Sequence, residues 1–104
     1  MRLRELAHAR TGDKGAVLNI SVIAFDPLDY PRLEREVTAA RVERLLAPVI
    51  HGPVLRYALP ELGALNFVLQ RKPGQEVTRT LALDAHAKSL SSALLALELE
   101  EAEG

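Results

Sequence analysis

The alternation of apolar and polar residues along this chain predicts four strands. Residues 17–25 form the clearest one, because apolar side chains occupy both faces, as in a central strand covered on at least one side. Residues 3–9 are expected to form a shorter strand. Residues 54–59 and 64–70 alternate regularly and are joined by a short connection, which is typical of an antiparallel hairpin.

Two other stretches have helical spacing. Residues 28–50 are predicted to be helical in two pieces, with Pro31 in a first turn and Thr38 capping the second piece. Residues 51–53 are expected to stop this helix, since a histidine, a glycine and a proline follow one another there. Residues 85–99 carry leucines three and four apart, which predicts a second amphipathic helix.

The order strand, strand, helix, strand, strand, helix predicts an α+β fold. We expect a two-layer sandwich, in which two helices cover one face of a mainly antiparallel four-stranded sheet. This ββαββα order is a circular shift of the ferredoxin-like pattern. The length of 104 residues suits one domain spanning residues 1–104, with a core small enough that oligomerisation would help it.

Composition narrows the possible partners. Thirteen basic and fourteen acidic residues are mixed along the chain, which argues against a nucleic-acid-binding protein because phosphate recognition needs clustered cations. The chain has no cysteine, which excludes disulfides, thiolate metal sites and thiol nucleophiles. It shows no signal-like core and no apolar run of membrane-spanning length, so we expect a cytoplasmic protein without a membrane segment.

The most unusual stretch is polar and lies between two strand-like runs: Arg10-Thr11-Gly12-Asp13-Lys14-Gly15. Its glycines favour a loop with a tight turn. One interpretation is an anion site, in which backbone N–H groups near the glycines form a concavity and Lys14 or Arg10 supplies charge. The other is a structural turn, in which Asp13 accepts hydrogen bonds from nearby backbone amides.

Asparagines and histidines supply the other candidates. Asn19 stands in a strand where an apolar residue is expected, so we predict that it holds the loop or faces a ligand, whereas Asn66 is expected to be exposed. His8 lies beside the loop and is the only candidate general base. His51 is interpreted as a helix C-terminal residue, and His86 as a surface residue. No metal or cofactor is predicted, because the histidines lack ligand spacing.

Several segments together resemble the AtuA-like ferredoxin-fold domain, which occurs at the C-terminus of acyclic terpene utilisation proteins and as free-standing chains. The segments that carry the resemblance are residues 6–15, 19–24, 59–69, 78–84 and 88–90, so it extends over nearly the whole length of the chain. It implies a ferredoxin-like fold. It also implies a role beside a larger AtuA-like partner chain in acyclic isoprenoid or acyl-CoA catabolism. It does not imply a particular reaction.

Two hypotheses follow for the function. The chain is a small accessory subunit that docks on a larger AtuA-like chain or forms a homo-oligomer. Alternatively, it is an enzyme, or a domain that binds a small anion or an acyl-CoA at residues 10–15. In that case Asp13 is the acid/base, Lys14 and Arg10 are anion anchors, and His8 is a proton shuttle. The remaining ligand-binding candidates are Gly12, Gly15 and Asn19.

Overall fold

A computed structural model of the chain describes residues 1–72 and 90–100. In these residues four strands form one antiparallel sheet in the order β1-β2-β4-β3. The strands are β1 (Ala7–Lys14), β2 (Val17–Ala24), β3 (Ile50–Leu59) and β4 (Ala64–Arg71). Between β2 and β3 lie the helices α1 (Tyr30–Glu36) and α2 (Ala39–Leu46), and residues 90–95 are also helical.

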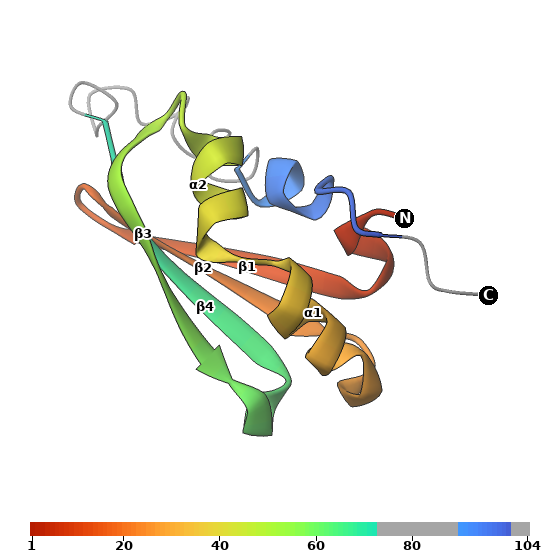
Figure 1. Ribbon diagram of the computed structural model, residues 1–104. Helices are drawn as coiled ribbons and strands as arrows, with labels where there is room; N and C mark the ends of the chain where they lie inside the picture. The colour runs from red at the N-terminus through yellow and green to blue at the C-terminus, as the bar shows by residue number, and fades with distance from the viewer. Residues whose placement is uncertain (73–89, 101–104) are drawn as a thin grey trace.

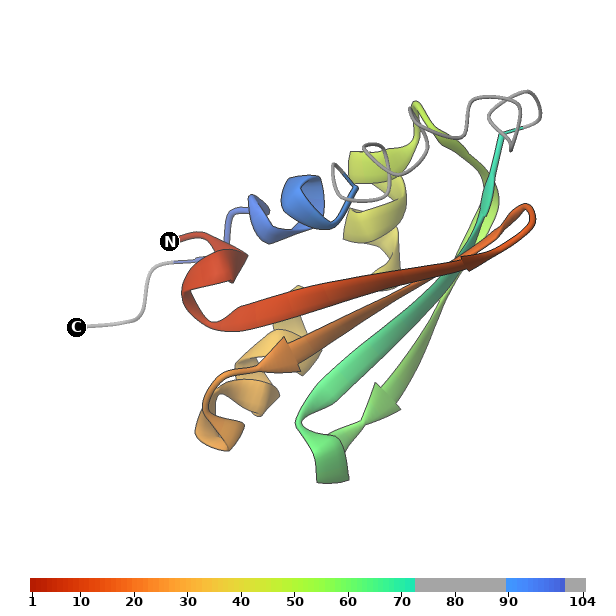
Figure 2. The same ribbon diagram turned by 180° about the vertical axis from the view of Figure 1, so that it is seen from behind.

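All three helical segments lie on the same side of the sheet (Figures 1 and 2). Short 3-10 turns occur at Leu3–Glu5, Pro27–Asp29 and Pro60–Leu62. The predicted α+β fold, with helices on one face of a four-stranded antiparallel sheet, is therefore confirmed. The circular shift of the element order stays a prediction. The start of the helix predicted at residues 85–99 lies outside the described residues.

The first strand differs from its prediction at both ends. Leu3–Glu5 forms a 3-10 turn, and β1 continues to Lys14, through the stretch expected to be a loop. The turn itself contains only Gly15 and Ala16, because Lys14 already pairs with Val17. Positive φ occurs at Gly15 (67°) and not at Gly12. The hairpin therefore has a two-residue loop, whose first residue needs the conformational freedom of glycine.

The helical region breaks as predicted but ends earlier. Thr38 caps α2, since its side chain accepts a hydrogen bond from Arg41 N at 3.2 Å. The expected stop at residues 51–53 is wrong, because α2 ends at Leu46 and β3 begins at Ile50. Pro48 accounts for the earlier end, since proline cannot donate the hydrogen bond that would continue a helix. His51 is therefore a strand residue and not a helix C-terminus.

The core fills the space between the sheet and the helices. Its completely buried side chains come from every layer: Leu18, Ile20, Val22, Leu65, Phe67 and Leu69 from the sheet, and Leu33, Val42 and Leu94 from the helical side. The two ends of the described chain meet beside it. Leu3 N donates to Leu97 O and Leu99 N donates to Met1 O, so residues 97–99 are extended and not the helix that was predicted there.

Candidate functional site

The predicted site residues do not share one side of the molecule, because β1 is a strand and its side chains alternate. Asp13 points to the covered face, where it contacts Arg71. Thr11 also points there, and its hydroxyl lies against that of Ser91 in the helical segment 90–95. Arg10 and Lys14 are exposed on the opposite side of the strand. The anion-site interpretation placed Arg10, Asp13 and Lys14 together, and the strand separates Asp13 from the two cations.

We call the side of the sheet that lacks described helices the open face. Cross-strand pairing assigns its residues. They are His8, Arg10, Gly12 and Lys14 of β1; Val17, Asn19, Ser21 and Ile23 of β2; Ala64, Asn66, Val68 and Gln70 of β4; and His51, Leu55, Tyr57 and Leu59 of β3. None of these residues is acidic. The open face therefore combines apolar side chains and cations without a carboxylate.

Asp13 has a specific partner on the covered side. Arg71 Nη2 lies 2.5 Å from Asp13 Oδ2, and the Arg71 side chain is only 6% exposed. The backbone N of Arg71 also donates to Ala16 O at 2.8 Å, beside the turn. Asp13 therefore neutralises a buried guanidinium and ties the end of the β1–β2 hairpin to β4. This is a structural role, although the partner is a side chain and not the backbone amides that were expected.

Arg71 is a site residue that the sequence interpretation missed. The signal was present, because Arg71 continues the period-two series of Leu65, Phe67 and Leu69, all of which point into the core. An arginine in phase with buried residues requires hydrogen-bond acceptors, and a carboxylate is the acceptor that also compensates its charge. Nothing in the local pattern identifies Asp13, which lies 58 residues away in the sequence, as that partner.

The two cations of β1 do not converge on one point. Arg10 and Lys14 lie four residues apart on one strand, which separates their Cα atoms by about 13 Å. Neither forms an ion pair with any residue that the structure describes. Between them is Gly12, where open space replaces a side chain. They can meet two separate groups of a large partner, but they cannot clamp a single small anion together.

The other candidates on the open face also have definite positions. His8 stacks on Phe25, with ring centroids 5.5 Å apart. Because side chains alternate along β1, His8 lies on the opposite side of the strand from Asp13. Asn19 is exposed opposite Gly12, and its side chain forms no hydrogen bond within the described residues, so nothing supports its predicted loop-holding role. Asn66 is half-buried, where exposure was expected, and accepts from Ser21 Oγ at 3.3 Å.

The apolar part of the open face comes mainly from β3. Leu55 is 49% exposed, Tyr57 is 51% exposed and Leu59 is 39% exposed. Arg56, between them, points to the covered face and donates to the carbonyls of Glu34 and Val37 at 2.7 and 2.9 Å. A guanidinium that satisfies carbonyls at the end of α1 explains why this strand turns its large apolar residues outward.

A groove of about 520 Å³ lies elsewhere, between the junction of α1 and α2 and the C-terminal segment. Glu36 lines it and is 7% exposed. Its carboxylate accepts from Arg32 Nε at 2.9 Å and from Glu100 N at 2.7 Å. Burial raises the pKa of Glu36, but the hydrogen bonds from Glu100 N and Arg32 and the nearby arginines outweigh it, so its pKa lies below the ordinary value.

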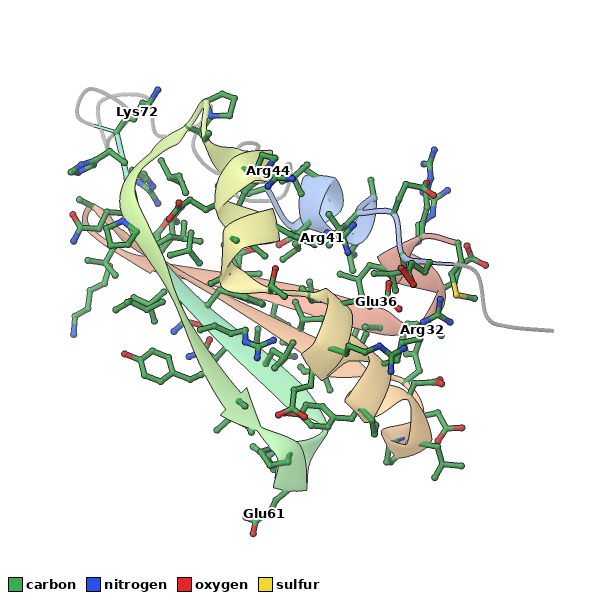
Figure 3. The ribbon with its side chains drawn as sticks, viewed as in Figure 1. Arg32, Glu36, Arg41, Arg44, Glu61 and Lys72 are labelled. Atoms are coloured by element: carbon green, nitrogen blue, oxygen red, sulfur yellow. The ribbon has the colours of Figure 1, made fainter. Side chains whose placement is uncertain are left out.

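The groove's polar groups serve the fold. Arg41, also on the groove, donates to the carbonyls of Glu36 and Glu98 at 3.0 and 2.5 Å. Figure 3 shows Arg32, Glu36 and Arg41 on the side of the helices that faces the C-terminal segment. These contacts attach residues 98–100 to α1 and α2. They leave the Glu36 carboxylate, the groove's buried charge, already paired.

Two kinds of feature are absent from residues 1–72 and 90–100. No three histidine, aspartate or glutamate side chains gather there as ligands for a metal ion. No helix in that part of the chain has the length and apolar character needed to cross a membrane.

Comparison with known proteins gives one result. The family model of the AtuA ferredoxin-like domain matches residues 1–100. The match includes all four strands, both faces of the sheet and the segment that carries Glu98 and Leu99. Neither curated proteins nor solved structures gave a significant match.

Proposed function

The chain belongs to the AtuA ferredoxin-like domain family, and we propose that it acts as a small accessory subunit that binds another protein chain through its open face. One observation carries the proposal. A rigid sheet exposes Leu55, Tyr57 and Leu59 on the side that no described element covers. Contiguous apolar surface of this kind, next to polar residues, is typical of protein interaction sites.

The dimensions of the open face agree with this role. Four strands about 4.8 Å apart, three of eight residues and β3 of ten, present about 500 Å² in projection. A standard interface buries about 800 Å² on each partner, so the open face supplies an interface at the small end of the range. Tyr57 lies near the middle of β3 and is the aromatic anchor that such interfaces favour.

The expected partner is a larger AtuA-like chain, or further copies of this one. The resemblance of the sequence supports the first choice, together with a place in acyclic isoprenoid or acyl-CoA catabolism. The geometry supports the general role, because the open face combines exposed apolar side chains with cations and none of its assigned residues is acidic. Catalysis receives less support, since Asp13 is paired with Arg71 and lies on the other face from His8, Arg10 and Lys14.

A second candidate function is binding of an acyl-CoA or another elongated anion. It is favoured by the exposed Arg10 and Lys14, which have no ion-pair partner among the described residues and lie beside apolar side chains. Small-molecule sites are usually concave and have converging polar groups. The separation of about 13 Å between the two cations is therefore better suited to a protein surface.

Light scattering after size exclusion tests the main proposal. We would measure the mass of the wild type alone and mixed with the larger AtuA-like chain of the same organism. Tyr57→Arg should abolish the assembly that the wild type forms, while its circular dichroism spectrum stays unchanged. Leu28→Arg is the matched control, because Leu28 is 86% exposed but lies outside the open face.

The result that contradicts the proposal is a wild type that stays monomeric alone and in the mixture. The acyl-CoA alternative has its own measurement, a titration with acetyl-CoA followed by amide chemical shifts. Saturable shifts centred on Arg10 and Lys14, with no protein assembly, would support that alternative in place of the interaction role.

A further inference from the structure

We propose that the open face binds a second copy of this chain, face to face, with β1 of each copy over β3 of the other. This inference rests on the proposed function, because it requires the open face to be a docking surface. It adds the identity of the occupant and the arrangement of the two copies. Three features of the face carry it: the position of its cations, the sizes of its side chains and its area.

The first feature is the distribution of charge. Arg10 and Lys14 lie on β1, at one edge of the sheet, and β3 forms the opposite edge. The open-face residues of β3 are His51, Leu55, Tyr57 and Leu59, so this edge has no lysine, arginine or carboxylate on that face. A two-fold axis parallel to the strands exchanges the two edges. This axis places β1 of each copy over β3 of the other. The Arg10 and Lys14 residues of the two copies then lie about 14 Å apart across the sheet.

The other face-to-face arrangement has its two-fold axis across the strands. That axis brings β1 over β1, so Arg10 and Lys14 of the two copies would come together. No acidic side chain of the open face could separate them. Like charges brought together without a counter-charge oppose association. The charge pattern therefore selects the axis parallel to the strands.

The second feature is the match of side-chain size along each cross-strand row. A row here is a set of four neighbouring residues, one from each strand, that face the same side of the sheet. With this axis every row of one copy lies over the same row of the other copy, in reverse order. One row runs Gly12, Asn19, Val68, Leu55, so the open space at Gly12 faces the partner's Leu55. At both ends of this row, the large side chain of Leu55 in one copy therefore faces the glycine of the other copy.

The neighbouring row adds specific contacts. It runs Arg10, Ser21, Asn66, Tyr57, so the guanidinium of Arg10 faces the ring of the partner's Tyr57. A guanidinium over a tyrosine ring is a favourable cation–π pair. Ser21 faces the partner's Asn66, which can exchange hydrogen bonds with it. Sheets that pack face to face keep their strands aligned to within about 30°. The central rows of the two copies therefore remain nearly opposite one another.

The third feature is area. Two open faces of about 500 Å² each bury about 1,000 Å² together, which is about the minimum for a biological interface and the size of a weak, reversible one. A foreign partner would need carboxylates placed over both Arg10 and Lys14. In a second copy the ring of Tyr57 lies over Arg10, and Lys14 belongs to the end row that runs Lys14, Val17, Gln70, His51, where its long side chain can keep the ammonium in water. The competing occupant, an acidic protein surface, differs in one measurable respect: its binding weakens steeply with salt.

Sedimentation velocity of the full chain over about 1–200 μM, at low and high salt, tests this inference. We expect a species of twice the 11.4 kDa monomer mass that persists at high salt. Gly12→Leu should weaken the dimer at least 10-fold, since it fills the space that the partner's Leu55 occupies. The double variant Gly12→Leu/Leu55→Ala should restore the dimer. Thermal melts establish whether both variants are folded. If Gly12→Leu does not fold, Tyr57→Arg serves as the disrupting variant in its place.

Each other outcome overturns the inference in a recognisable way. A dimer that Gly12→Leu leaves intact uses another surface. Weakening without rescue by Leu55→Ala excludes β1 over β3. A monomer at every concentration that still binds the larger AtuA-like chain, with Tyr57→Arg abolishing that binding, rules out the second copy but supports the proposed function. A monomer that binds nothing overturns both.

Discussion

The two faces of the sheet are made from the same four strands, yet they have different roles. On the covered face Phe67 and its neighbours are fully buried, and two arginines point inward with them. On the open face Tyr57 and Leu55 are about half exposed. Apolar side chains occur on both sides, so the hydrophobicity of a residue does not indicate where it lies. We infer that the covered face provides stability and that the open face provides recognition.

The strongest test of this comparison exchanges one aromatic residue on each face for alanine. Phe67→Ala should lower the free energy of unfolding by about 3–5 kcal/mol, because it leaves a cavity in the core. Tyr57→Ala should lower it by about 1 kcal/mol or less, since only cross-strand contacts are lost. Urea unfolding measures both, at a concentration where association contributes nothing. Equal losses would show that the open face is part of a core.

The second test concerns the charge buried on the helical side. Glu36→Gln should lower the free energy of unfolding by about 2 kcal/mol, less than the roughly 3–5 kcal/mol for breaking a fully buried ion pair, because Arg32 retains some exposure. Glu61→Gln is the matched control, since Glu61 is exposed and should change stability by less than about 0.5 kcal/mol. Both values come from urea unfolding at pH 7.

The pH dependence of the same variant follows from the lowered pKa of Glu36. A depressed carboxyl pKa contributes stability that is complete above the unfolded value, 4.5, and is lost as pH falls through the folded value. The difference in stability between wild type and Glu36→Gln should therefore be constant from pH 7 to about pH 5 and shrink below it. A difference that grows on acidification would contradict this account.

The prediction with the smallest expected effect compares substitutions at two adjacent residues that lie on opposite faces of the sheet. Asp13→Asn should cost about 1 kcal/mol, because Arg71 loses its anion but the half-exposed carboxylate is already screened by water. For a domain of this size that lowers Tm by about 4–8 °C. Lys14→Gln should leave Tm nearly unchanged. Scanning calorimetry distinguishes the two, and equal decreases would show that Lys14 also has a structural partner.

Much of the fold could be predicted, because it depends on local signals. The strand predicted at 17–25 is observed at Val17–Ala24, the capping role of Thr38 is observed, and the hairpin of β3 and β4 is observed. The extension of β1 was missed because its covered side carries the small or polar Ala9, Thr11 and Asp13. Such an edge strand has no hydrophobic alternation, so its glycines resembled those of a loop.

The sequence by itself determined the family, the alternation along each strand and the set of polar residues near Gly12. The alternation itself indicates the buried side of β4, because Leu65, Phe67 and Leu69 share one face. Only the tertiary structure decided which side of β1 and β3 is buried, because contacts between distant residues fix it. Arg71 reaches Asp13, and Arg56 reaches the end of α1, so both guanidinium groups point inward. Because neighbouring side chains must then point outward, these pairings place Tyr57 and Lys14 on the open face.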